Sequence, residues 1–280
     1  MTPSPALENS ASRGSPNGFR PILLAEVEWS RPQTISRLCE RLVAENFQLA
    51  QVLVRQHSFP LGLVNFDTSI DVPDVDWLAK KIWASLSDRI MEHLQDDEIE
   101  PESYMHDRAG SQAVPHCQRV YHAALDAAPF VSVIVATRNR LPQLKLCISS
   151  LLSLNYPTYE VLIVDNAPES NEVGEYIAST FSQDTRVRYI VENNAGLAIA
   201  HNRALSETNA SIVAFTDDDV IVDPEWLLSL VANFQQDFQV ACVTGMILPL
   251  ELDTPSQQWI EQFGGFSKGF ERITYDLTHH

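Results

Sequence analysis

Three consecutive carboxylates, Asp217, Asp218 and Asp219, are the residues of this chain with the clearest capacity for chemistry. They follow the apolar, β-branched run 211–216, which is typical of a buried strand. Adjacent carboxylates repel one another, and a bound divalent cation removes that repulsion. Because hard cations such as Mg²⁺ prefer carboxylate and phosphate oxygens, the triplet suggests a metal-bridged phosphate ligand. The alternative is an acidic turn that faces solvent.

A fourth acid, Asp223, lies close to the triplet but has a different interpretation. It precedes Pro224 and Trp226, and aspartate followed by proline is typical of a helix N-cap with proline at the first helical position. We therefore expect Asp223 to cap a helix and not to bind a ligand.

Other polar residues also follow predicted strands. Strands at 130–136, 159–164 and 187–191 alternate with helices at 143–154, 173–181 and 197–207, and a further strand is expected at 239–245. This alternation predicts a doubly wound, mostly parallel sheet of the α/β class. Because the carboxyl ends of parallel strands meet at one edge, where ligands bind, several polar groups should converge there. They are Thr137, Arg138, Asp165, Asn193, Asn194 and the acidic triplet.

Composition and missing motifs exclude several classes of function. The net charge of −18 argues against nucleic acid as a partner, and no apolar run approaches the ~20 residues of a membrane span. Neither Gly-x-Gly-x-x-Gly nor a P-loop signature follows the strand at 130–136, which argues against a dinucleotide site and against a P-loop site. The four cysteines lack CxxC spacing, so a zinc cluster or disulfide framework is not expected. We expect a cytoplasmic protein, free or peripheral at the inner membrane face.

The chain divides into four segments by composition. Residues 1–20 are a Ser/Pro/Asn-rich, disordered lead, and residues 21–95 predict a small β-α-β-β-α module. Residues 96–129 begin with an acidic, turn-rich stretch and are expected to form a linker with one short helix, open to proteolysis, before the α/β domain at 130–280. In the module, His57 and His93 stand alone in the sequence and are expected to be surface or packed residues.

Four motifs, in this order and spacing, resemble glycosyltransferase family 2. They lie at 131–139, 164–166, 193–198 with Asn202, and 216–219. The resemblance runs from Phe130 to the end of the chain. It implies the GT-A fold, inverting transfer of a hexose-like sugar from a UDP-, GDP- or dTDP-linked donor, and Mn²⁺ or Mg²⁺ as cofactor. The acceptor would be a glycan, a lipid or a polysaccharide.

The same resemblance implies roles for single residues. Asp165 would bind the base, and Asp219 and Asp217 would hold the metal, with Asp218 as rival ligand. The nucleotide-sugar pocket would be formed by Ala136, Thr137, Arg138, Asp165, Asn193, Asn194, Gly196, Asn202, Asp217 and Asp218. As alternatives, Asp165 caps a turn, Asn193 and Asn194 are ordinary turn residues, and His201 and Arg203 are surface residues.

The general base that inverting transfer needs is not found in the sequence. Glu251, Asp253 and Glu261 are the nearby downstream acids, and none lies in a matching motif. The alternative is therefore a nucleotide-sugar-binding or interaction protein that lacks the acceptor part, and we expect this chain to bind a donor but to transfer its sugar slowly. A sugar nucleotidyltransferase is a second alternative, but its glycine-rich signature with Arg and Lys is missing after the strand at 130–136.

Overall fold

The computed structural model describes residues 19–69, 73–100 and 114–276 of the 280-residue chain. Its contacts divide the chain into two compact units: Met1–Pro115 with Met246–His280, and His116–Gly245. Residues 246–280 therefore group with the first unit, whereas the sequence assigned them to the α/β domain. Most of the predicted lead and the middle of the predicted linker lie outside the described residues.

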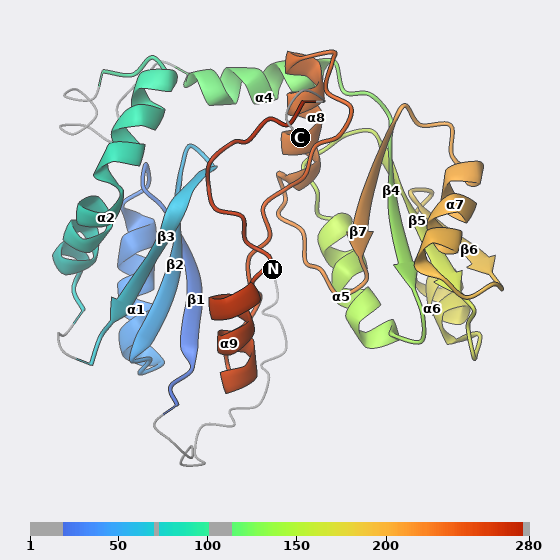
Figure 1. Cartoon of the computed structure of the whole chain (residues 1–280), viewed down its shortest axis with the longest axis horizontal. Helices are drawn as coiled ribbons and strands as arrows, with labels where there is room; N and C mark the ends of the chain where they lie inside the picture. Colours follow the sequence, from blue (N-terminus) through green and yellow to red (C-terminus); the bar gives the residue numbers. More distant parts are fainter. Residues whose placement is uncertain (1–18, 70–72, 101–113, 277–280) are drawn as a thin grey trace. The chain divides into compact units, whose positions relative to one another are not determined.

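The first unit is built on a three-stranded sheet with two helices packed on one face (Figure 1). The strand order is β1-β2-β3, with β1 parallel and β3 antiparallel to β2. This confirms the predicted β-α-β-β-α order. The elements are β1 (Ile22–Glu28), α1 (Gln33–Ala44), β2 (Leu49–Gln56), β3 (Phe59–Asp67) and α2 (Val75–Asp96).

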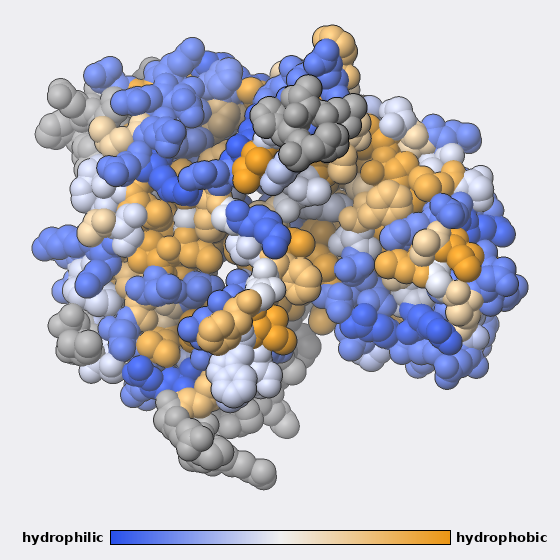
Figure 2. Space-filling model, in the orientation of Figure 1, coloured by the Kyte–Doolittle hydropathy of each residue, from blue (hydrophilic) through white to orange (hydrophobic). Residues whose placement is uncertain are grey.

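A segment from the end of the chain joins this unit. The Ile22 amide donates to the Leu252 carbonyl at 3.3 Å. The helix that follows, α9 (Pro255–Gly264), was not predicted, although Thr254 and Gln257 form a capping box that signals a helix start. Figure 2 shows apolar surface over β1, β2 and β3, where a groove forms. Its lining includes Leu24, Leu53, Leu63, Leu248 and Leu250.

The second unit is a four-stranded, fully parallel sheet in the order β6-β5-β4-β7. Helices cover both of its faces, which confirms the predicted α/β class and the mostly parallel sheet. None of the described helices is both long and apolar enough to cross a bilayer. The elements are α4 (His116–Asp126), β4 (Val131–Thr137), α5 (Leu141–Leu151), β5 (Tyr159–Asn166), α6 (Glu172–Thr180), β6 (Val187–Glu192), α7 (Leu197–Glu207), β7 (Ile212–Asp217) and α8 (Trp226–Gln236).

The two faces of this sheet explain why its strands are nearly continuous apolar runs. Ile134 and Leu162 pack with Ala200 of α7 on one face, and Val133 and Val135 pack in the larger cluster with α5 and α8 on the other. A strand buried on both faces has no polar side to alternate with. The edge where the strands end is therefore carried on a rigid core.

One sequence prediction in this part of the chain was not met. The predicted strand at 239–245 is wrong, because these residues have no ladder partner and most of their side chains are exposed. A β-rich run becomes a strand only where a neighbouring strand and a packed face accept it. The short helix expected within the linker is present as α4, which packs on α8, with the Tyr121 hydroxyl 2.8 Å from Ser229 Oγ.

Candidate functional site

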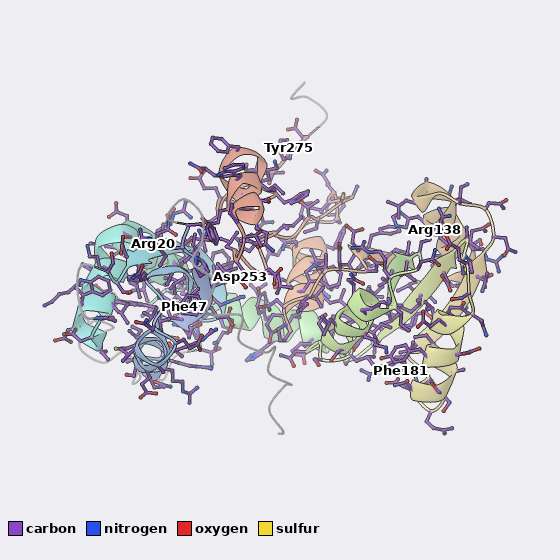
Figure 3. The ribbon with its side chains drawn as sticks, turned by 90° about the horizontal axis from the view of Figure 1, so that it is seen from below. Arg20, Phe47, Arg138, Phe181, Asp253 and Tyr275 are labelled. Atoms are coloured by element: carbon purple, nitrogen blue, oxygen red, sulfur yellow. The ribbon has the colours of Figure 1, made fainter. Side chains whose placement is uncertain are left out.

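The strand register brings the predicted site residues to one edge of the second unit. Thr137 at the end of β4 pairs with Asp165 at the end of β5, and Ala136 pairs with Asp217 at the end of β7. The loops that follow the strands begin at this edge. Arg138 is exposed directly after β4 (Figure 3), and Asn193 is exposed directly after β6.

The acidic triplet is held by the last residue of β4, Thr137, and by Arg140 of the loop that follows. Thr137 Oγ1 donates to Asp218 Oδ2 at 2.7 Å, and Arg140 donates to Asp218 Oδ1 at 2.9 Å and to Asp219 Oδ2 at 2.7 Å. Asp218 is buried, and this burial raises the pKa of its carboxyl, while Thr137 and Arg140 act in the opposite direction. Asp217 and Asp219 are exposed.

Arg140 is a site residue that sequence reasoning missed. Its hydrogen bond to Asp219 and the charge of Asp218 raise the pKa of the guanidinium, so it is a permanent cation beside the triplet. The available signal was its place in the loop after β4, next to Arg138. Nothing in the sequence tells which of the two arginines turns toward β7.

A buried thiol lies behind the triplet. Cys147 Sγ is 3.4 Å from the Asp217 carbonyl oxygen, and burial, reinforced by the acids of the triplet, raises the pKa of the thiol to about 12. Such a thiol stays protonated at neutral pH, so Cys147 packs beneath β7 and is not a nucleophile.

Asp165 is buried with an incomplete set of partners. The Tyr189 hydroxyl donates to Asp165 Oδ2 at 2.8 Å, whereas Oδ1 is buried without a hydrogen bond within the described part of the chain. The carboxylate is 1% exposed, and desolvation raises its pKa. An unsatisfied buried acceptor destabilises the fold unless a ligand or water donates to it. The side chain therefore does not cap a turn, which was the alternative interpretation.

Asn166, which sequence reasoning also left without a role, fixes the loop after β6. Its Nδ2 donates to the Asn194 carbonyl at 2.7 Å, and its Oδ1 accepts from the Gly196 amide at 2.8 Å. Gly196 has φ +147°, and α7 begins directly after it. The Asn194 side chain turns to Glu192 Oε1 at 2.9 Å. The loop is thus held at the edge by its neighbour strand, and Asn202 is exposed further along α7.

The prediction that Asp223 is the N-cap, with Pro224 at the first helical position, is wrong, because α8 begins at Trp226 and its N-cap is Glu225, which makes no side-chain capping bond. The side chain of Asp223 instead closes the turn before α8: its Oδ1 accepts from the Glu225 amide at 2.8 Å, and its carbonyl accepts from the Trp226 amide at 2.9 Å. Its side chain therefore serves the helix start, in contrast to the exposed Asp217 and Asp219.

Comparison with known proteins gives a family match to the region that contains this edge. The model of the family described as glycosyl transferase family 2 matches residues 132–279, which is more than half of the chain. Among curated relatives, glycosyltransferase AglE of Haloferax volcanii is 34% identical over 103 residues, covering 35% of this chain and 33% of that protein. Glycosyltransferase GlyA of Streptococcus pneumoniae is 29% identical over 114 residues, covering 39% of this chain and 16% of that protein.

The chain spans only between 13% and 33% of the length of the first three curated relatives that it matches. These relatives are therefore considerably longer than the matched region. Among solved structures, the chain is similar to a mannosyltransferase from Pyrobaculum calidifontis in complex with GDP-Man and Mn²⁺. That similarity has 26% identity and a TM-score of 0.35, and covers 42% of this chain and 37% of the other.

Proposed function

The chain belongs to glycosyl transferase family 2, and from this premise we propose that its second unit binds a nucleotide-diphosphate sugar for transfer to an acceptor. The observation that carries the proposal is the convergence of Thr137, Asp165 and the acidic triplet at the carboxyl edge of one parallel sheet. Such an edge is where open α/β sheets bind ligands.

The chemistry of the triplet fits a divalent cation with oxygen ligands. Asp217 and Asp219 present exposed carboxylates, which suit Mn²⁺ or Mg²⁺ and not a thiolate-seeking metal. These two residues would hold the ion. When bound, it neutralises the charge of the leaving diphosphate. Asp218 keeps the triplet in place from below, because Thr137 and Arg140 hold both of its oxygens.

The other residues of the edge would hold the nucleotide. Asp165 Oδ1 accepts from a ring N–H of the base, which gives this buried oxygen the partner that it lacks. The loop of Asn193, Asn194 and Gly196 covers the ribose and the diphosphate. The amides at the start of α7 offer donors to phosphate oxygens. Ala136, Arg138 and Asn202 complete the pocket.

A thermal-shift panel tests the proposal. We expect UDP, GDP or dTDP to raise the melting temperature in the presence of Mn²⁺ and to have little effect in its absence. The corresponding nucleotide sugar should then release its nucleoside diphosphate slowly, with water or a supplied glycan, lipid or polysaccharide as acceptor. No response to any of the three nucleotides with Mn²⁺ would reject the proposal.

A further inference from the structure

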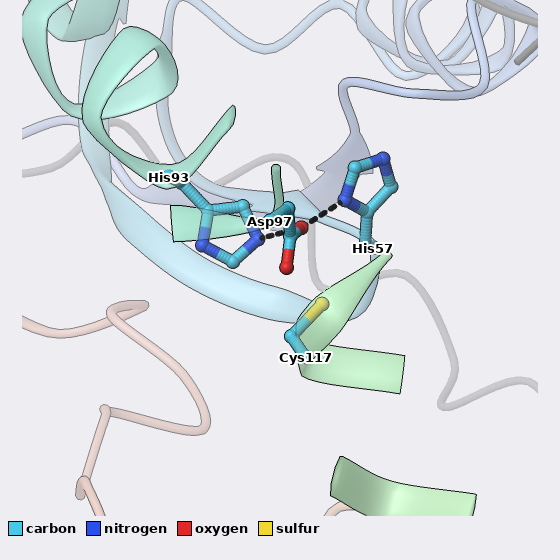
Figure 4. A group of neighbouring side chains, drawn as sticks. All are labelled: His57, His93, Asp97 and Cys117. Carbon is cyan, nitrogen blue, oxygen red and sulfur yellow. Dashed lines mark hydrogen bonds and ion pairs between the residues drawn. The ribbon is translucent and has the colours of Figure 1, made fainter. Parts of the chain in front are cut away.

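A buried cluster of His57, His93 and Asp97 lies in the first unit, outside the site described above (Figure 4). Asp97 Oδ2 is 2.7 Å from His57 Nδ1 and 3.1 Å from His93 Nε2. The three side chains are 9%, 8% and 1% exposed. The two histidines are packed, as one of the sequence expectations had it, but they are not isolated, because the turn between β2 and β3 meets the end of α2.

One atom of this cluster lacks a partner that satisfies it. His93 Nε2 is buried and makes no hydrogen bond of acceptable geometry within the described residues, although Asp97 Oδ2 is near. Leaving a buried ring nitrogen unsatisfied costs free energy, and coordination to a metal ion would satisfy it. Figure 4 shows the two imidazoles on opposite sides of the Asp97 carboxylate, and one ligand atom of each of the three residues lies within 4.8 Å of the others.

The backbone holds these three side chains in place at a local cost. His93 and Asp97 are four residues apart at the end of α2, so they share one face. His57 and Ser58 form the β2–β3 turn with φ of +54° and +70°, a conformation that is unfavourable for non-glycine residues. Glu28 stabilises this turn by accepting from both amides at 2.9 Å. The fold thus supports a strained turn that directs His57 at Asp97.

We propose that His57 Nδ1, His93 Nε2 and an oxygen of Asp97 bind Zn²⁺. Zinc takes imidazole and carboxylate ligands at about 2.0–2.2 Å, which places ligand atoms about 3.3 Å apart in a tetrahedral site. The observed 2.7 and 3.1 Å approach this spacing, so small movements admit the ion. Figure 4 also draws Cys117, which belongs to the second unit, and the proposal rests on the three residues of the first.

The donor set separates this site from the acidic triplet. Two imidazoles with one carboxylate favour Zn²⁺, whereas the all-oxygen triplet favours Mg²⁺ or Mn²⁺. Three protein ligands leave the fourth position of a tetrahedral ion to water, and the ion would join the turn between β2 and β3 to the end of α2.

The test measures Zn²⁺ affinity of the full chain, freed of metal with a chelator, in competition with a chromophoric chelator. The decisive variant is His57→Asn, because asparagine accepts positive φ in a two-residue turn but removes the ligand. His122→Asn on the exposed face of α4 is the matched control, and Asp219→Asn checks for binding at the triplet.

We expect His57→Asn and Asp97→Asn each to weaken Zn²⁺ binding by at least about 100-fold, and to abolish the rise in melting temperature that Zn²⁺ gives the wild type. His122→Asn and Asp219→Asn should retain both effects. Circular dichroism identifies which variants are folded. Wild-type affinity in either folded ligand variant, or no tight Zn²⁺ binding by the wild type, would overturn the proposal.

Discussion

Arg140 supplies the positive charge that partly neutralises the triplet when no cation is bound. Its two bonds, to the buried Asp218 and the exposed Asp219, tie the loop after β4 to the end of β7. A metal ion held by Asp217 and Asp219 would compete with or add to this charge. The guanidinium and the ion would therefore both neutralise negative charge of the triplet.

Replacing Arg140 with Gln should make the second unit more dependent on metal. Because Arg140 is half exposed, we expect a loss of only about 1 kcal/mol without metal, a fall of a few degrees in melting temperature. Mn²⁺ should then raise the melting temperature more in the variant than in the wild type. Differential scanning fluorimetry with and without Mn²⁺ measures this.

The control for Arg140→Gln is Arg41→Gln, which breaks an exposed pair with Glu45 on α1. It should leave the Mn²⁺ response unchanged. A smaller Mn²⁺ response in Arg140→Gln than in the wild type would show that the arginine assists metal binding and does not stand in for the metal.

Asp165 predicts a dependence of stability on pH. Burial raises its pKa in the folded state above the unfolded value of about 3.9, so its contribution to stability is fully present below that pH and is lost as pH rises through the folded pKa. Asp165→Asn has no such loss, and Tyr189 can still donate to the amide oxygen. The melting temperature of the variant, relative to the wild type, should therefore increase from pH 4 to 7, by about 2–4 °C per kcal/mol of stability.

The same substitution should weaken nucleotide binding, because the carboxylate oxygen that would accept from the base is replaced. A variant that gains stability at pH 7 and loses affinity is the pattern of a residue kept for binding. A melting-temperature difference that stays constant with pH would contradict the buried, ionising state of Asp165.

At the scale of elements, the loop before α7 depends on one glycine. Gly196 has φ +147°, and a Cβ there would lie 3.3 Å from the Ile199 side chain. Gly196→Ala should cost roughly 1–3 kcal/mol and loosen the loop that Asn166 holds, so nucleotide affinity should fall with it. Thermal denaturation and calorimetry measure the two effects.

Gly264→Ala in α9 is the matched control, since a Cβ there meets no atom within 4 Å. It should leave nucleotide affinity unchanged. Equal losses of affinity in the two variants would mean that the Gly196 loop is not part of the binding site.

Strands were predictable where burial on both faces of the sheet requires a continuous apolar run of residues. β4 and β5 are apolar runs because both faces of the sheet are covered, and their carboxyl ends fall where the sequence placed them. Residues 239–245 are also mostly apolar but have no partner strand. The sequence did not predict the hydrogen bonds of Arg140 and Asn166 or the proximity of His57 and His93. These are tertiary contacts between distant segments, which no local sequence pattern encodes.

At the scale of the whole molecule, the two units have separate hydrophobic cores. A ligand stabilises the unit that binds it, by mass action. In scanning calorimetry we expect two unfolding transitions. UDP, GDP or dTDP with Mn²⁺ should raise the temperature of one transition, and Zn²⁺ should raise the temperature of the other. Ligands at 100 times their dissociation constant should add about 2.7 kcal/mol to the unit concerned. A single transition that both ligands raise equally would contradict independent units.

The net charge of −18 opposes the binding of an anionic donor. A diphosphate that approaches such a chain meets repulsion, which a divalent cation at the triplet removes. Nucleotide binding should therefore depend on the metal, because the molecule is acidic and the acidic triplet lies at the sheet edge where the nucleotide would bind.

Isothermal titration calorimetry of UDP, GDP and dTDP, with and without Mn²⁺, measures this dependence. We predict binding of at least one nucleotide only with the metal, weakened at least about 10-fold by Asp219→Asn and retained in Asp223→Asn, whose side chain serves the start of α8. Tight binding without a divalent cation, or equal losses in the two variants, would contradict the account.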